Sequence, residues 1–434
     1  MPLVLGGCLL AAPVLMASQN WDDHNRANKY TAIAMAKAYL DSCEPNAILF
    51  TIGDNDTFPL WYAQEIEGIR TDIKIVNTSL FMTDWYIDQM KCKTYKSDGL
   101  PISFSHEQYV GDKLDYAIFN EKTKSRWNIK DLLNFIGNDD PRTLVEMQNG
   151  QKIHFYPTNL ARIPVDTVAY RQYNKDVSKN DSIVPYIDIE IKGQAMYKNR
   201  IMMLDVIANN NWKRPVYFTG GSFGDDDYLW MKDFLQLDGM VYKLVPIYSP
   251  IPEDGSALDM GKINSDKMYD IVMKWDWGNS ELASVYHDPE TRKNSISYRS
   301  NLARLMEQLV NEGKLDKAKK VIDLAMYKMP VELFGYYSLV DPFAGGYYAV
   351  GEKAKARKLL DQLMTKYKEN LSYYKGLPAS EQNDIAIDIV TDIERYRALL
   401  MVMKDRGDLG YYNQNKPTFN SYNSFFKRFG RDNE

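Results

Sequence analysis

The first part of the chain alternates between helical and strand-like patterns of apolar positions, joined by short polar loops. An Ala-rich helical pattern over Asn25–Asp41 precedes an apolar run over Ala47–Ile52, which predicts a buried strand. A short helix over Leu60–Glu67, a strand over Ile73–Asn77 and a helix over Trp85–Lys91 follow. Strands separated by helices are typical of right-handed parallel crossovers, so the sequence predicts an α/β domain with a mostly parallel sheet.

The pattern weakens over residues 93–195 and then returns. We interpret this segment as an insertion into the α/β domain, because polar loops interrupt its short apolar runs. The predicted elements of the insertion and of the chain after it are a helix over Lys122–Asn134, strands over Lys152–Tyr156 and Tyr186–Ile191, a helix over Met196–Asn209, and strands over Val216–Thr219 and Met240–Ile247. The α/β domain is therefore expected to span residues 18–255.

Beyond Pro250 the periodicity becomes helical. Residues 298–329 contain two helical patterns joined at Asn311–Lys314, and their small and apolar positions match a tetratricopeptide repeat: Leu302, Leu305, Leu309, Ala318, Ile322 and Ala325. A second unit begins near Gly351 and Ala356, and a third helical pair is expected over Asn383–Lys404. Residues 256–434 are thus predicted to form an all-α domain of tetratricopeptide-like repeats, which bind proteins or brace a neighbouring domain.

The amino-terminal segment carries no charged residue from Met1 to Met16 and turns polar at Ser18. A helix needs about 20 apolar residues to cross a bilayer, and no positive region precedes this stretch as in a secretory signal. We interpret residues 1–17 as the end of a transmembrane helix whose beginning is missing. Trp21 then falls where aromatic residues gather at a membrane interface. The membrane is therefore an expected partner.

Composition narrows the classes of function. The formal net charge of -5, without a polybasic stripe, argues against nucleic acid as a partner. The three cysteines and four histidines show no metal-type spacing, which argues against a histidine-based metalloenzyme. The 31 tyrosines and 8 tryptophans fit carbohydrate or protein contact surfaces, although rings that pack between helices give the same composition.

The run Gly53-Asp54-Asn55-Asp56-Thr57 follows the first predicted strand directly. Open α/β sheets bind ligands at the carboxyl edge of their strands, so Asp54, Asn55 and Asp56 are candidate site residues. Two carboxylates can hold a Mg²⁺ or Ca²⁺ ion. A strand followed by two aspartates also resembles a haloacid-dehalogenase-type phosphatase, but Thr57 stands one place too early for that motif. The alternative is structural: a turn at Asp54 and a helix cap at Asp56.

A second polar group follows the apolar segment. Asp22, Asp23, His24 and Arg26 can contact a sugar or an acceptor. They can equally begin the first helix, because aspartates near a helix amino terminus suit the helix dipole. Both interpretations stay open.

Aromatic and glycine-rich stretches complete the candidates. Trp85 and Tyr86, together with Trp61, can offer faces on which a ligand stacks. Gly220–Gly224 can cradle a phosphate through backbone N–H groups, but the aspartates at Asp225–Asp227 would repel it and favour a solvated loop.

Several of these motifs occur together in one family. They are Asn20–His24 with Arg26 and Tyr30, Gly53–Thr57, Glu67–Asp72, Asp84–Ile87, Asn199–Asp205 and Arg214–Phe218. With them the chain resembles the carboxy-terminal region of the Bacteroidetes domain of unknown function 2723 membrane proteins. This family is classed as glycosyltransferase family 117 and is similar to the transmembrane-protein-260-type protein O-mannosyltransferases. The resemblance covers nearly the whole chain and is strongest up to about residue 220.

The resemblance implies a multi-spanning transferase that uses a lipid-linked or similar sugar donor. It also implies a large extracytoplasmic domain at the carboxy end. In such transferases the catalytic acidic residues lie in an early loop between amino-terminal membrane helices. Those helices are not part of this sequence, so no catalytic residue is assigned to it.

We therefore expect the extracytoplasmic carboxy-terminal region of a membrane glycosyltransferase-like protein, in the bacterial inner membrane with its soluble part in the periplasm. Its expected role is acceptor recognition or structural support in protein O-glycosylation, with acceptor proteins or glycans as partners. No cofactor is expected beyond the divalent cation considered for Asp54 and Asp56. Two alternatives stay open: a metal-dependent hydrolase centred on these aspartates, and a repeat-based protein-interaction scaffold.

Overall fold

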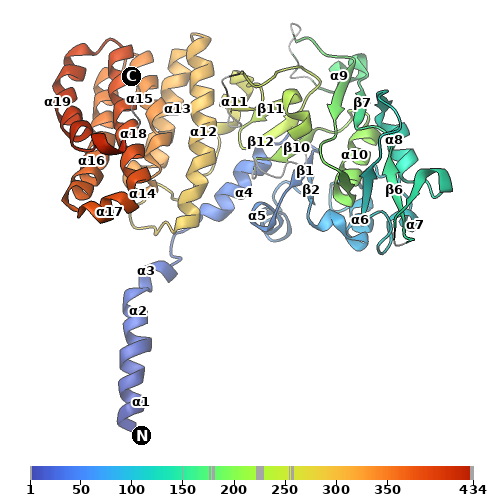
Figure 1. Cartoon of the computed structure of the whole chain (residues 1–434), viewed down its shortest axis with the longest axis horizontal. Helices are drawn as coiled ribbons and strands as arrows, with labels where there is room; N and C mark the ends of the chain where they lie inside the picture. The colour runs from blue at the N-terminus through green and yellow to red at the C-terminus, as the bar shows by residue number, and fades with distance from the viewer. Residues whose placement is uncertain are drawn as a thin grey trace. The chain divides into compact units, whose positions relative to one another are not determined.

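The structure is a computed structural model of the chain, and it divides into two compact units. It describes residues 2–148, 150–174, 177, 181–220, 229–253, 255 and 259–430. Unit 1 combines Met1–Lys29 with Asn279–Glu434, and unit 2 spans Tyr30–Gly278. Figure 1 shows the helical pairs of unit 1 from yellow to red and the sheets of unit 2 in blue and green. The domain limits 1–17, 18–255 and 256–434 stay predictions.

The main sheet of unit 2 has five strands in the order β11-β12-β10-β1-β2. β10 (Val216–Thr219), β1 (Ile48–Thr51) and β2 (Lys74–Asn77) are parallel, and all their residues are buried. β12 (Val241–Leu244) runs antiparallel to β10 and to β11 (Leu235–Asp238). The sheet is therefore mixed, and the expectation of a mostly parallel sheet was wrong.

A tight turn causes the change of direction. β11 and β12 are joined by Gly239 and Met240, and strands joined by a two-residue hairpin loop are antiparallel. Gly239 has a φ of +60°, and a Cβ at this position would lie 2.2 Å from the Ser42 hydroxyl. Glycine is therefore required here. The apolar run over Met240–Ile247 predicts a strand correctly but carries no sign of its direction.

Three helices precede, connect and follow strands β1 and β2 of the main sheet. α4 (Thr31–Asp41) leads into β1, α5 (Asp54–Glu65) connects β1 to β2, and α6 (Asp84–Lys91) follows β2. α5 begins earlier than the expected start at Leu60. The reason is that Gly53 is extended and serves as its N-cap, so the chain becomes helical directly after the strand.

Two other expected helices start later in the structure. The helix expected over Asn25–Asp41 shortens to α4, because Asn28 has a left-handed φ of +60° and interrupts it. The helix expected over Lys122–Asn134 starts only with α8 (Ile129–Ile136), whose N-cap is Asn128. A left-handed residue before α4 and a polar cap before α8 set these boundaries more strongly than the apolar period does.

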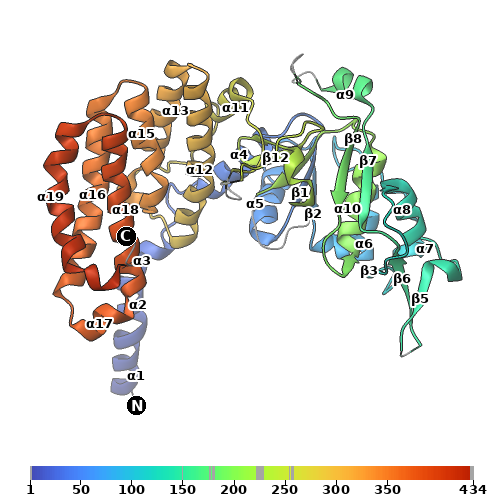
Figure 2. The ribbon, with the colours of Figure 1, turned by 45° about the horizontal axis from the view of Figure 1, so that its top comes forward.

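Two smaller sheets are built from residues 116–197, in the orders β5-β6-β3-β9 and β4-β7-β8. Their strands are β3 (Tyr116–Phe119), β4 (Trp127–Asn128), β5 (Leu144–Glu146), β6 (Lys152–Tyr156), β7 (Leu160–Pro164), β8 (Tyr186–Glu190) and β9 (Ala195–Tyr197). With α8, strand β6 lies at one end of unit 2 in both views (Figures 1 and 2). This segment separates β2 from β10 in the sequence.

The remaining helices of unit 2 are one long buried helix and three short ones. They are α10 (Lys198–Asn210), α7 (His106–Tyr109), α9 (Thr167–Tyr173) and α11 (Ser265–Val272). α10 is buried along almost its whole length. The expected helix over Met196–Asn209 coincides with it, except that the first two residues belong to strand β9.

Unit 1 consists mainly of helix pairs that pack side by side (Figure 2). The pairs are α12 (Pro289–Asn311) with α13 (Leu315–Lys328), α15 (Asp341–Ala349) with α16 (Lys353–Gly376), and α18 (Ala386–Asp405) with α19 (Leu409–Phe425), and the short helices are α14 (Val331–Phe334) and α17 (Ala379–Asp384). Each pair turns at a glycine with positive φ: Gly313, Gly351 and Gly407. The pair expected over Asn383–Lys404 is largely the single helix α18. The tetratricopeptide assignment stays a prediction.

The amino-terminal apolar segment is helical from Pro2 to Gln19, through α1 (Pro2–Leu9), a π-helical turn (Leu10–Val14) and α2 (Leu15–Gln19). Its mean hydropathy is 1.6, and none of its residues is buried. Within the described part of the chain, this is the one helix whose length and composition suffice to cross a membrane. A membrane anchor and a signal sequence share these properties.

Candidate functional site

The carboxyl ends of β1, β2 and β10 meet at one edge of the main sheet, where Asp54, Asn55 and Asp56 form the first turn of α5. Asp54 and Asn55 are exposed. Asp56 is partly buried, and its Oδ2 accepts a hydrogen bond of 2.9 Å from the Thr219 hydroxyl at the end of β10. Burial raises the pKa of Asp56, and the hydrogen bonds from Thr219 and the Ile52 backbone oppose that rise. Asp56 therefore links two strand ends, while Asp54 and Asn55 face solvent.

A network of hydroxyl and amide groups lies beneath this turn. The hydroxyls of Thr51 and Thr57 lie 2.6 Å apart, and the Asn77 side-chain amide donates to the Thr57 hydroxyl at 2.9 Å. Thr78 donates to the Thr51 carbonyl at 3.0 Å, and Ser79 donates to the Ile52 carbonyl at 2.9 Å. These polar groups satisfy one another, so they fix the amino end of α5 as a rigid platform.

The chemistry open to this edge is hydrogen bonding by exposed oxygens. Carboxylates in the first turn stabilise α5, but they repel a phosphate that would otherwise suit a helix amino terminus. In the described part of the chain, no group of three or more His, Cys, Asp or Glu side chains is placed to hold a metal ion. A divalent cation at Asp54 and Asp56 stays a prediction. Residues 221–228, which include most of the glycine-rich loop with its aspartates, lie outside the described residues.

The two aromatic candidates on α6 differ in environment. Trp85 is 55% exposed, whereas Tyr86 is 2% exposed. The Tyr86 hydroxyl accepts a hydrogen bond of 3.0 Å from the Asn77 backbone, and burial raises its pKa to about 12. Tyr86 therefore belongs to the core and supports the strand end, while Trp85 presents an open ring. On α5, the Trp61 ring stacks on Phe58 with centroids 5.6 Å apart.

The second polar group, Asp22 to Arg26, belongs to unit 1 and so to a different unit from Asp54. Helix α3 (Trp21–His24) contains Asp22, Asp23 and His24, and the Asp22 side chain lies outside the described residues. Arg26 donates to the Asp23 carbonyl at 2.5 Å, and His24 Nδ1 lies 2.9 Å from the Asn20 carbonyl. These contacts are local ones that shape the short helix.

The segment around α3 is tied to the start of the helical pairs. The Asp23 carboxylate is hydrogen-bonded to Tyr286, and the Lys29 ammonium pairs with Asp288 and lies over the Tyr286 ring. The Asn279 side chain also donates to the Asn28 carbonyl at 2.9 Å. We call these contacts the amino-terminal clasp. They hold residues 23–29 against residues 279–288 within unit 1.

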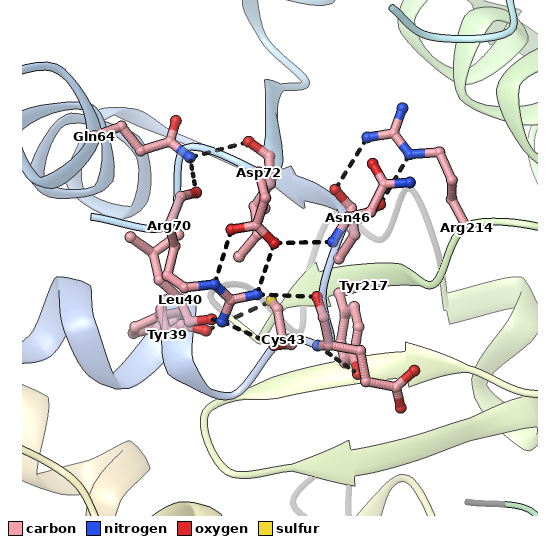
Figure 3. Close-up of polar contacts among 12 residues, drawn as sticks. Tyr39, Leu40, Cys43, Asn46, Gln64, Arg70, Asp72, Arg214 and Tyr217 are labelled. Carbon is pink, nitrogen blue, oxygen red and sulfur yellow. Dashed lines mark hydrogen bonds and ion pairs between the residues drawn. The ribbon is translucent and has the colours of Figure 1, made fainter. Parts of the chain in front are cut away.

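Arg70 fixes the loop between α4 and β1 (Figure 3). It donates to the carbonyls of Leu40, Cys43 and Glu44 at 2.7, 3.0 and 3.1 Å. It also donates to both carboxylate oxygens of Asp72, at 3.0 and 3.1 Å. All five N–H donors of a guanidinium are thereby used. Arg70 is a structural clamp and has no donor left for a ligand.

Arg214 holds the same loop from the other side. Its guanidinium donates to the Asn46 carbonyl at 2.9 Å and to the Ala47 carbonyl at 3.3 Å (Figure 3). Asp72 accepts the Asn46 backbone N–H at 2.9 Å, so both arginine clamps meet at this loop. Arg70 precedes β2 and Arg214 precedes β10, so both clamps lie at the amino ends of the parallel strands and away from Asp54. Sequence reasoning missed this role, because the carbonyl acceptors carry no side-chain signature.

Helix α10 carries two buried charged side chains, Lys198 and Asp205, and Asp205 belongs to the motif Asn199–Asp205. Lys198 is 1% exposed and donates to the Tyr109 and Gly111 carbonyls, each at 3.1 Å, and to Asp115 at 2.7 Å. Asp205 accepts two hydrogen bonds of 2.6 Å from Ser103. Burial raises the pKa of Asp205, and these hydrogen bonds oppose the rise. The charges join α10 to the loops around it.

A comparison with protein families identifies the relatives of this chain. The family model described as TMEM260-associated domain 2 matches residues 32–267, which is more than half of the chain. The chain belongs to this family. The comparison with curated proteins and that with solved structures gave no match. The family description sets the chain among TMEM260-like membrane proteins.

The TMEM260-associated domain 2 match covers nearly all of unit 2 and leaves out the rest. The arginine clamps, the buried charges of α10 and the Asp54 turn all lie inside the matched residues. The amino-terminal clasp and the helical pairs lie outside them. The clamps give a structural role to Arg70 and Asp72 in the motif Glu67–Asp72 and to Arg214 in the motif Arg214–Phe218.

The same domain also contains an open pocket of about 580 Å³, lined by residues 41–44 and by α11. Lys267 pairs with Glu44 and, at 2.8 Å, with Asp238. Lys243 reaches Glu44 at 2.5 Å, and the Tyr217 hydroxyl donates to Asp238 at 3.1 Å. Glu44 and Lys267, two of the charged residues that line the pocket, are paired and connect α11 to the main sheet, so we assign these charges to the fold. The sequence signal was too weak to find the pocket, because its residues come from segments far apart in the chain.

Proposed function

We propose that this chain is the extracytoplasmic carboxy-terminal region of a membrane glycosyltransferase-like protein, and that it recognises the acceptor. The observation that carries the proposal is the TMEM260-associated domain 2 match over residues 32–267. The apolar helix from Pro2 to Gln19 supports a membrane context. We also propose the finer relation, to the domain of unknown function 2723 group and glycosyltransferase family 117, with the soluble part in the periplasm of a bacterium.

The contacts at the sheet edge favour recognition over bond-making. Thr51, Thr57 and Asn77 are hydrogen-bonded to one another and so are engaged in holding the platform. Asp54 and Asn55 present free oxygens on a rigid helix start, which suits hydroxyl groups of a protein or glycan acceptor. Trp85 offers an exposed ring on α6, the helix that follows β2. In this proposal the helical pairs of unit 1 provide support.

The test is to change the exposed face of the turn and measure glycosylation. Cells that produce the protein receive the Asp54→Asn and Asn55→Ala variant, and the masses of their exported glycoproteins are compared with those from the unchanged protein. We expect sugar occupancy to fall by about tenfold, because two acceptor contacts are lost. Asp131→Asn is the matched control, since Asp131 is an exposed aspartate in the first turn of α8. Unchanged occupancy in a variant that melts normally would overturn the proposal.

The divalent cation is examined in the same proteins. If Mg²⁺ or Ca²⁺ binds between Asp54 and Asp56, addition of the metal raises the melting temperature and Asp54→Asn removes that rise. If the two carboxylates act only as hydrogen-bond acceptors, metal and chelator leave the melting temperature unchanged. The melting curves therefore separate the acceptor proposal from a metal-dependent hydrolase.

A further inference from the structure

Helix α5 exposes a stripe of apolar side chains. Phe58, Tyr62 and Ile66 are 51%, 48% and 70% exposed, and they follow one another at intervals of four residues. Such spacing places them on one face of the helix, over a length of about 12 Å. Trp61 stacks on Phe58 and widens the stripe. We call these four residues the α5 face.

A hydrogen bond to a carboxylate holds one ring of this face, and another holds a tyrosine outside it. The Tyr62 hydroxyl donates to Glu67 at 3.0 Å, and the hydroxyl of the exposed Tyr95 bonds to Glu65. The Tyr62 ring is therefore ordered in advance, which lowers the entropy cost of binding a partner. The other side of α5 packs into the core through Leu60 and Ala63. The core therefore does not need the exposed residues of the α5 face.

Two carboxylates border the α5 face: Glu67 accepts the Tyr62 hydroxyl, and Glu65 is bonded to the hydroxyl of Tyr95. From Pro45 to Ile69 the acidic residues are Asp54, Asp56, Glu65 and Glu67, and lysine and arginine do not occur. An apolar surface with a rim of carboxylates is complementary to a partner that carries both apolar and cationic groups. The same rim disfavours an anionic lipid surface by repulsion.

A polypeptide fits this combination better than a glycan does. Ile66 and Phe58 have no hydrogen-bonding group in their side chains, and Ile66 is the most exposed member of the stripe. Burial of a partner's apolar side chain against such a surface is favourable. A neutral sugar, in contrast, would leave the acidic rim without a counter-charge. We propose that the α5 face is a docking surface for a polypeptide segment that carries lysine or arginine beside apolar side chains.

The experiment measures binding of two labelled peptides to the full chain in non-ionic detergent micelles. Both peptides are about twelve residues long, long enough to cover the stripe, and share leucine positions. One carries arginine and the other glutamate at the remaining positions. Fluorescence anisotropy is recorded at low and high salt. Partition of the peptides into micelles is the same for every protein variant and cancels in the comparison.

We expect the arginine peptide to bind about tenfold more tightly than the glutamate peptide, and salt to reduce the difference. Ile66→Ser with Tyr62→Ser should weaken binding by about tenfold, and Glu65→Gln with Glu67→Gln should remove the preference for arginine. Val168→Ser is the control, because Val168 is an exposed apolar residue of α9 in the same unit. Circular dichroism checks that each variant folds.

Equal binding of both peptides, or no loss in the Ile66 variant, overturns the inference. So does binding of an oligosaccharide or of lipid vesicles that depends on Ile66, which would assign the face to a glycan or a membrane. Self-association that disappears in the Ile66 variant would assign it to a second copy of the chain. None of these measurements involves sugar transfer, so failure of the proposed function leaves this result intact.

Discussion

Asp341, the first residue of α15, has a carboxyl oxygen that is buried without a hydrogen-bond partner in the described structure. Burial raises its pKa to about 7, and the Arg395 guanidinium only partly opposes the rise. The folded protein therefore keeps this proton up to about pH 7, while the unfolded chain releases it near pH 4. The free energy of unfolding should fall as the pH rises through this window, because the folded state holds more protons than the unfolded state.

We expect Asp341→Asn to raise the free energy of unfolding by about 2 kcal/mol at pH 8 and to have little effect near pH 4. Urea denaturation followed by circular dichroism at several pH values measures this difference. Asp408→Asn is a control of opposite sign. The Arg357 guanidinium holds the pKa of Asp408 well below its usual range, so this variant loses stability at neutral pH. A pH-independent effect of Asp341→Asn would contradict the assignment.

Single residues also show where sequence reasoning succeeds. The position of Asp54 at the carboxyl end of β1 was predicted from the buried run before it, because strand ends define a sheet edge whatever the rest of the fold does, while its role in a site stays a prediction. Tyr86 was not separated from Trp85 by its sequence, since only the helix orientation decides which ring is buried. Arg70 escaped notice because its acceptors are main-chain carbonyls of residues 40, 43 and 44.

At the scale of elements, the connection from α4 to β1 depends on Arg70. Arg70→Lys replaces a planar group with five donors by an ammonium with three, so main-chain carbonyls lose their partners. We expect the free energy of unfolding to fall by about 2 kcal/mol. Urea denaturation of the full chain measures the change.

Arg142→Lys is the matched control for this element. Arg142 also bonds both oxygens of an aspartate two residues away, Asp140, but it is exposed and contacts no distant carbonyl. Its replacement should leave stability nearly unchanged. If the two variants lose the same stability, the Arg70 clamp contributes no more than its local ion pair.

Most elements could be predicted, but their directions and partners could not. The strands Lys152–Tyr156 and Val216–Thr219 coincide with β6 and β10. The antiparallel hairpin depends on the turn at Gly239, and no apolar pattern encodes it. The third helix pair was placed too early, because α19 contains Pro417 and few buried residues and so shows a weak helical period.

At the scale of the whole molecule, the chain has three parts: unit 2, the helical pairs of unit 1 and the apolar amino-terminal helix. Unit 2 contains the TMEM260-associated domain 2 match, the helical pairs lie outside it, and the apolar helix has no buried residue. The amino-terminal clasp shows that the segment after the apolar helix belongs with the helical pairs. An apolar helix without packing contacts should contribute to membrane binding and not to the stability of the fold.

Deletion of residues 2–19 separates these contributions. We expect the shortened chain to stop floating with lipid vesicles in a density gradient, while its melting temperature stays the same. Lys29→Ala should do the reverse. It removes the ion pair with Asp288 and the contact with Tyr286, so the melting temperature falls by about 2 °C while flotation persists. Continued flotation of the shortened chain would show that another surface binds the membrane, and a lower melting temperature would show that the apolar helix packs against the fold.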